Sequence, residues 1–286
     1  WAALSMVLWL GMLTGTIELP THLDPVSWHA HEFLFGYLGA VAAGFLLTAV
    51  PNWTGRLPVL GWPLAGLASL WLAGRVAMAV SAMMPPALVA ALDLAFPLAM
   101  TALLLREVAS GGNWRNLPVV GILALLLVGN AAFHWQAWGG GYAARGPGLR
   151  LGLAAAVLLI ALIGGRIVPS FTRNWLVREG HAARPVPPMA GFDRLALALL
   201  LVALLLWLVR PMAPVTGAAL LLAGVAHLVR LARWSGAHTG AEPLVWILHA
   251  GYGFVPVGAL ALGIAVLWPG LVAPASAQHL WMAGAI

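Results

Sequence analysis

Residues Trp28 to Gly55 read WHAHEFLFGYLGAVAAGFLLTAVPNWTG, and this stretch decides the fold. After its first residues it stays apolar for about the 20 residues that a helix needs to cross a bilayer. Two histidines and a glutamate, His29, His31 and Glu32, lie at its start. Ionisable groups are costly inside a membrane, so each of the three is a candidate functional residue.

The composition extends this interpretation to the whole chain. Of 286 residues, 62% are hydrophobic and only 8% are charged, against roughly 25% charged residues in soluble domains. Apolar runs of spanning length recur, without the alternation that is typical of transmembrane strands. We therefore expect an all-α, polytopic transmembrane helical bundle. We expect residues 1–286 to form a single integral membrane domain that is truncated at both ends.

Several functional classes are excluded by what the sequence lacks. There is no cysteine, which excludes disulfides, thiolate metal sites and thiol nucleophiles. The formal charge of +6 comes from arginines that are spread over loops, so it does not indicate nucleic-acid binding. We find no P-loop, dinucleotide fingerprint, HExxH motif or nucleophile elbow.

The apolar runs predict nine complete spans and the start of a tenth. Their approximate bounds are Ala2–Leu19, Pro25–Val50, Trp62–Ala82, Pro86–Leu105, Leu117–Trp138, Leu149–Val168, Arg194–Val209, Pro214–Leu231, Leu244–Trp268 and Ala275–Ile286.

The arginines predict the orientation of these spans. Ten of the 14 cationic residues lie in the loops after the even-numbered spans or at the span ends beside them, and three lie in or beside the loops after the odd-numbered ones. Cytoplasmic loops carry the excess of positive charge, so the even-numbered loops are expected to be cytoplasmic. We thus expect a multi-pass protein of a bacterial inner membrane, in contact with lipid, with Trp28–Glu32 at the outer face.

Helical geometry predicts how the first cluster is arranged. Successive residues of a regular helix are rotated by about 100°, so His29 and Glu32 share a face and His31 points away from it. The face of His29 continues through small residues, which let helices approach closely: Gly36, Ala40 and Gly44. His29 and Glu32 are therefore expected to face the bundle interior, and His31 to face lipid or an apolar cofactor slot. An interfacial histidine beside a snorkelling glutamate would give the same pattern.

Further histidines lie near predicted span ends. His134 and His279 are expected on the outer side, with Asn130 one turn before His134 and able to orient its ring. His227 and His249 are expected at similar depth on neighbouring helices at the inner side. Neutral imidazole is a ligand for haem iron, copper and zinc. The alternative interpretation of each of these histidines is a polar group that holds neighbouring helices together by hydrogen bonds.

Two charges within predicted spans are expected to pair. Arg75 and Asp93 lie in the outer halves of adjacent antiparallel spans, which places them at one depth. A structural ion pair is one interpretation, because a lone charge in a membrane is costly. The other is an arginine that holds haem propionates, because guanidinium suits planar carboxylates.

The segment HAHEFLFGYLGAVAAGFLLTAVPNWTGR resembles the signature of the NnrS family, as do GGRIVPSFTRNWL at Gly164–Leu176, LVWILHAGY at Leu244–Tyr252 and the segment around His279. These are bacterial membrane proteins of about a dozen helices that contain haem and copper and are linked to nitric oxide metabolism. The resemblance covers nearly the whole chain. The other positions that match its motifs are Asn52, Trp53, Arg166, Pro169, Asn174, Trp175 and Tyr252.

The resemblance implies a protein that binds haem, of b type, and copper, and that acts in nitric oxide metabolism or in protection from nitrosative stress. It leaves open whether nitric oxide is turned over, sensed or kept from other metal centres. The candidate cofactor ligands are His29, His31, His134, His227, His249 and Arg75, and the candidate metal ligands are His29, His31, Glu32, His249 and His279. A secondary transporter or metal-ion permease and a quinone-linked, cytochrome-b-like subunit are the alternative functions.

Overall fold

The computed structural model describes residues 1–285, and every regular element among them is helical. The chain divides into two compact units, Trp1–Ala155 and the part that begins at Ala156. The first contains α1 (Ala2–Thr14), α2 (Pro25–His31), the π-helix η1 (Glu32–Tyr37), α3 (Leu38–Thr54), α4 (Trp62–Ala79), η2 (Ser81–Met83), α5 (Pro86–Ser110), η3 (Trp114–Asn116), α6 (Leu117–Trp138), η4 (Ala143–Arg145) and the start of α7 (Pro147–Arg178). The second contains the rest of α7, α8 (Gly191–Val209), α9 (Pro214–Ala232), η5 (Gly236–His238), α10 (Pro243–Leu267), α11 (Pro274–His279) and the π-helix η6 (Leu280–Ala285).

The all-α, polytopic class is confirmed, but the predicted number of spans is wrong. Seven helices in the described part of the chain are long and apolar enough to cross a membrane. The first predicted span is only the 13-residue α1. The third is α4, whose 18 residues fall outside this set, and the tenth begins with the 6-residue α11. α1 has its C-cap at Gly15, which adopts a left-handed conformation, α4 has its C-cap at Val80, and α11 continues directly into the π-helix η6.

The decisive stretch forms one continuous helix with a change of winding inside it. Asp24 caps it, as its position before Pro25 predicts, by accepting hydrogen bonds from the backbone of Val26 and Ser27 at 3.0 Å. From Glu32 to Tyr37 the helix is wound as a π-helix, and it returns to α geometry in α3. Such π segments occur often at functional sites.

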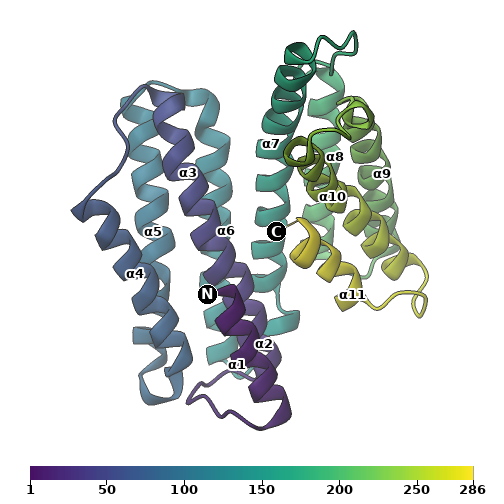
Figure 1. The fold of residues 1–286 in the computed structure, drawn as a ribbon. Helices are drawn as coiled ribbons and strands as arrows, with labels where there is room; N and C mark the ends of the chain where they lie inside the picture. The colour runs from purple at the N-terminus through teal and green to yellow at the C-terminus, as the bar shows by residue number, and fades with distance from the viewer. Residues whose placement is uncertain (286) are drawn as a thin grey trace. The chain divides into compact units, whose positions relative to one another are not determined.

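In the first unit, α3 and α4 both pack against α5, which also packs against α6 (Figure 1). The start of α7 approaches α6 through glycines. A Cβ added at Gly129 would lie 2.7 Å from the backbone nitrogen of Gly152, so the two backbones are in direct contact. This close approach also seats Phe35 over Gly152, beside the start of the polar cluster that is described below.

In the second unit, α9 packs against both α8 and α10, and η6 returns along α10 (Figure 1). Trp281 of η6 is fully buried and donates its indole N–H to the carbonyl of Val255 at 2.9 Å. Gly258 leaves the space for this ring, because a Cβ there would meet it at 2.3 Å.

The glycine contact gives a direct test of helix packing in the first unit. We expect Gly129→Ala to destabilise the protein by about 1–3 kcal/mol, because the added methyl overpacks a backbone contact. Gly121→Ala on the same helix meets nothing within 4 Å, so it should be neutral or stabilise by up to about 1 kcal/mol through helix propensity. Denaturation in detergent, followed by circular dichroism, measures both. Equal effects would contradict the packing.

Candidate metal centre

Six polar side chains from five helical elements meet inside the first unit. They are His31 of α2, Glu32 of η1, Arg75 of α4, Asp93 of α5, and Asn130 and His134 of α6. The first five are buried, and His134 is half-buried. These residues are called the polar cluster below. A group of this size in an apolar bundle is stable only if its members pair with one another.

Asp93 is the centre of the polar cluster. Its Oδ2 accepts a hydrogen bond from Asn130 Nδ2 at 2.7 Å and lies 3.2 Å from His31 Nε2 and 2.9 Å from His134 Nε2. Its Oδ1 pairs with Arg75 Nη2. One carboxylate from α5 therefore contacts α2, α4 and α6.

Arg75 joins the two carboxylates. Its Nη1 donates to Glu32 Oε1 at 2.5 Å while Nη2 donates to Asp93. Gly36 makes room for this guanidinium, since a Cβ there would lie 2.5 Å from Nη1. The ion pair between Arg75 and Asp93 is thus present. Both terminal nitrogens of Arg75 thus pair with the chain's own carboxylates.

The contacts of His31 require a positive charge at its ring, either a second proton or a metal ion. Nδ1 lies 3.1 Å from Glu32 Oε1, and Nε2 lies near Asp93 Oδ2 and 3.0 Å from Asn130 Oδ1. These oxygens only accept hydrogen bonds, because the amide nitrogen of Asn130 is turned to Asp93. A nitrogen lone pair cannot face two oxygens favourably. Either a second proton or a metal ion therefore belongs between Nε2 and those oxygens.

The spacing of the ligand atoms suits a metal ion. One nitrogen each of His31 and His134 and one oxygen of Asp93 all lie within 4.8 Å of one another, and no other such group of three His, Asp or Glu occurs in residues 1–285. Metal–ligand bonds of about 2.0–2.2 Å in a tetrahedral site place ligand atoms roughly 3.3–3.6 Å apart. The three side chains could therefore hold a small ion.

The prediction that Glu32 faces the interior is confirmed, whereas the alternative that His31 faces lipid is wrong. His31 is fully buried, together with Phe35 and Leu38 on its side, whereas Gly44 of the small-residue stripe is exposed. The stripe was taken as the packing face because small residues allow close approach. In the protein the aromatic side packs inward, and the π-helix changes the rotation between residues before and after it.

His29 lies outside the polar cluster. Its ring stacks on Trp9 of α1, with centroids 3.8 Å apart and planes at 18°. The predicted role of Asn130 is also different, because Asn130 contacts His31 and Asp93, and the partner of His134 is Asp93. Sequence reasoning assigned Asp93 only to the ion pair. Its further contacts with histidines could have been expected, because a carboxylate has a second oxygen and two histidines were predicted at the same depth.

A second buried network occupies the other unit. Arg230 donates to Asp193 Oδ1 at 2.9 Å and to the hydroxyl of Tyr252 at 2.8 Å. The hydroxyl of Tyr252 lies 2.8 Å from Nδ1 of His227, whose Nε2 contacts the carbonyl of Ala196 at 3.1 Å. The carbonyl can only accept, so Nε2 carries the proton and Nδ1 accepts from Tyr252. Both nitrogens of His227 are thus engaged. Asp193 lies just outside a predicted span and Arg230 at the end of another, so this pair was not predicted from the sequence.

The remaining candidate ligands of the second unit are placed separately. Nε2 of His249 lies 2.8 Å from the hydroxyl of Thr172, and its ring packs against Gly236, where a Cβ would lie 2.5 Å from Nδ1. His279 is exposed, and its Nδ1 donates to the carbonyl of Ala275 in its own helix at 2.7 Å. Neither belongs to the group of three ligand side chains in the first unit.

The other motif positions have local roles. Asn52 Nδ2 donates to the carbonyl of Thr48 at 3.4 Å, and the carbonyl of Trp53 accepts from Asn113. The remaining ones lie on α7: Arg166 is half-buried, Pro169 is buried inside the helix, Asn174 is exposed and Trp175 stacks on His181 with centroids 5.7 Å apart.

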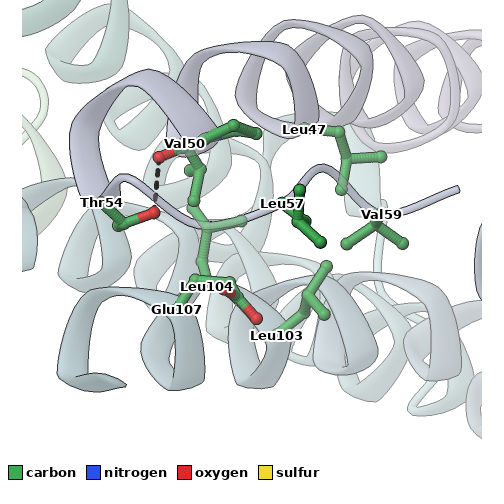
Figure 2. A pocket seen from close by; sticks show the side chains of 9 residues that line it. Leu47, Val50, Thr54, Leu57, Val59, Leu103, Leu104 and Glu107 are labelled. Carbon is green, nitrogen blue, oxygen red and sulfur yellow. Dashed lines mark hydrogen bonds between the residues drawn. The ribbon is translucent and has the colours of Figure 1, made fainter. Parts of the chain in front are cut away.

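The far end of α3 has a small pocket that suits no cofactor. Figure 2 shows its apolar wall, with Leu47, Leu57 and Leu103 around it and Thr54 donating to the carbonyl of Val50 at 2.9 Å. Its volume is about 10 Å³, which is room for about one water molecule. The polar cluster is therefore the stronger candidate.

Removing the shared cation tests the first network. We expect Arg75→Met to destabilise the protein by about 3–5 kcal/mol, because two buried carboxylates lose their counter-charge. The control is Arg56→Met: the Arg56 side chain is 44% exposed, and its partner Glu107 keeps Arg106 at 2.7 Å. That variant should change stability by less than about 1 kcal/mol. Thermal unfolding in one detergent compares the two, and similar losses would refute the role of Arg75.

Removing one oxygen tests the second network. Tyr252→Phe should destabilise by about 1–3 kcal/mol, because His227 and Arg230 each lose a buried partner. Tyr142→Phe, at an exposed ring, is the control and should be close to neutral. Chemical denaturation of both variants gives the comparison. A stability of Tyr252→Phe equal to wild type would show that the hydroxyl contributes nothing.

The family model described as NnrS protein matches residues 1–286, which is the full length of the sequence. No curated protein and no solved structure matches the chain. The match supports the resemblance found in the segment that starts at His29 and in the later motifs, and on its extent this multi-pass helical protein belongs to the NnrS family.

Proposed function

We propose that this protein binds a transition metal, copper, through His31, Asp93 and His134, and that it acts in nitric oxide metabolism or in protection from nitrosative stress. The observation that carries the metal site is the position of His31 Nε2, which lies 3.2 Å from Asp93 Oδ2 and 3.0 Å from Asn130 Oδ1. A metal ion at Nε2 would replace the proton that these contacts otherwise require. The nitric oxide role rests on family membership and resemblance.

The charge of the polar cluster supports a bound cation. Glu32 and Asp93 contribute two negative charges and Arg75 contributes one positive charge. With both imidazoles neutral, one negative charge is left in an apolar environment, where an uncompensated charge is costly. A cation held between His31, Asp93 and His134 offsets it.

The surroundings of His31 are those of a metal ligand. Histidines that bind metals almost always donate their other ring N–H to a carboxylate, a carbonyl or water, which fixes the tautomer. Nδ1 of His31 lies 3.1 Å from Glu32 Oε1. Glu32 is held in turn by Arg75. Glu32 is therefore proposed to orient the ligand, and not to bind the ion as the sequence analysis proposed.

Copper is the metal favoured by the donor set together with the resemblance. Two imidazole nitrogens and a carboxylate oxygen also suit zinc, iron and nickel. When bound, copper would supply one-electron chemistry and a place for a small ligand. The contribution of the chain is to hold the ion, to fix the ring of His31 and to compensate charge in a site without bulk water.

Haem, which the resemblance also implies, does not fit between the polar cluster side chains. Contacts of 2.9–3.2 Å join His31 and His134 to Asp93 and leave no space for a macrocycle. His227 has both nitrogens engaged. Of the proposed haem ligands, His249 would be freed most simply, by movement of Thr172. We propose His249 for haem on that ground.

Metal analysis with matched variants tests the proposal. Purified protein loaded with copper should retain about one ion per chain after desalting. We expect His31→Ala, Asp93→Asn and His134→Ala to lose it, and Glu32→Gln to weaken binding by about 10–100-fold. His238→Ala, at an exposed loop histidine, is the control. Copper retained by all three ligand variants would refute the site.

The visible spectrum of the same samples tests haem. A Soret band that shifts on addition of nitric oxide supports a haem that binds this molecule. We expect His249→Ala to lose the band and His31→Ala to retain it. Loss in the second variant alone would refute the assignment of haem to His249.

A secondary transporter is the second candidate function, favoured by the buried charges of the polar cluster, Arg75, Glu32 and Asp93. A wild-type protein that is free of metal and haem and still moves a substrate into liposomes would support it over the metal-binding function.

A further inference from the structure

A cavity of about 320 Å³ adjoins the polar cluster. It lies at the end of the first unit where the segment around His22 passes the ends of α4, α5 and α6. Its lining residues are His22, Leu23, Met78, Ser81, Pro86, Val89, Ala90, Phe133, His134, Ala137 and Trp138. His134 belongs to both the lining and the metal-binding group. A molecule in this cavity therefore lies against a side chain that contacts Asp93.

The walls of the cavity select against charge. None of its lining residues is Arg, Asp or Glu, and its polar side chains are only His22, Ser81 and His134. An anion would lose its hydration here without a cationic partner on the wall, which is unfavourable. A small uncharged molecule does not meet this penalty.

One wall of the cavity is held in place by Ser81. Its hydroxyl lies 3.0 Å from Thr21 Oγ1 and accepts from the backbone of His22 at 3.0 Å. The next residue, Ala82, donates its N–H to the carbonyl of Pro20 at 2.8 Å. These bonds attach the segment with His22 and Leu23 to the end of α4. The cavity volume of about 320 Å³ lies near the lower end of the roughly 300–1,000 Å³ that ligand pockets occupy.

We propose that this cavity admits a small, uncharged ligand with a lone pair to the metal ion, and that it excludes anions. The inference rests on the proposed metal site. Three protein ligands leave a coordination position for a further molecule, as in catalytic metal sites. The cavity at His134 provides the route, its apolar wall provides the selection by charge, and the Ser81 attachment limits the size.

Carbon monoxide and azide are the probes that test this route. Copper-loaded protein is reduced, and binding of carbon monoxide is followed by its infrared stretch. Azide is added to the oxidised protein, and the copper absorption is recorded. We expect wild type to bind carbon monoxide and its copper spectrum to be unchanged by azide.

Matched variants on α5 locate the route. Ala90→Leu extends a side chain into the cavity, whereas Ala87→Leu adds the same atoms at an exposed position outside it. We expect both variants to hold as much copper as wild type, and Ala90→Leu alone to lower the association rate of carbon monoxide by roughly tenfold, which corresponds to about 1.4 kcal/mol of barrier.

The outcomes separate this inference from the proposed function. Equal carbon monoxide rates in wild type and Ala90→Leu, at equal copper content, would overturn the route and leave the metal site intact. A copper spectrum that azide changes in wild type would overturn the selection by charge. Wild type that holds no copper would overturn the proposed function, and the inference with it.

Discussion

Two carboxylates buried in an apolar bundle set the requirements for the first unit. Glu32 and Asp93 come from different helices, and each is stable there only because Arg75 reaches both. That reach depends on the absence of a side chain at Gly36 and on the close approach of α4 and α5 at Gly74, where a Cβ would lie 3.1 Å from Asp93 Cα. Charge compensation thereby fixes the helix positions, and the helix positions bring His31 and His134 to Asp93.

The second unit solves the same problem with different chemistry. Asp193 and Arg230 form its buried pair, and Tyr252 and His227 extend it by neutral hydrogen bonds. In this chain of hydrogen bonds the donor and the acceptor of each bond are fixed, because Arg230 only donates and the carbonyl of Ala196 only accepts. In the first unit the two ring nitrogens of His31 face oxygens that accept. His31 in the first network therefore requires a second proton or a metal ion, whereas His227 in the second network needs neither.

The fold class and the importance of the segment around His31 could be predicted from the sequence, because both follow from hydropathy and from the cost of ionisable groups in lipid. The pairing of Arg75 with Asp93 was expected from depth alone. The facing of His31 was not, because a regular helix was assumed and η1 is a π-helix. Arg230 and Asp193 were missed because charges near span ends look like loop residues, and only packing reveals that both are buried.

The π-helix of Glu32–Tyr37 also changes what the long helix can carry. A π turn holds about one residue more than an α turn, so it shifts the angular phase of everything after it by about 100°. At the start of the helix, the buried side carries His31 and Glu32. After the π-helix, the buried side is an aliphatic ridge formed by Leu38, Ala42, Leu46 and Val50. Because of the extra residue, the rotation of the part before the π-helix does not fix the rotation of the part after it. One helix can therefore turn polar side chains inward in its first part and an aliphatic packing ridge inward in its second part.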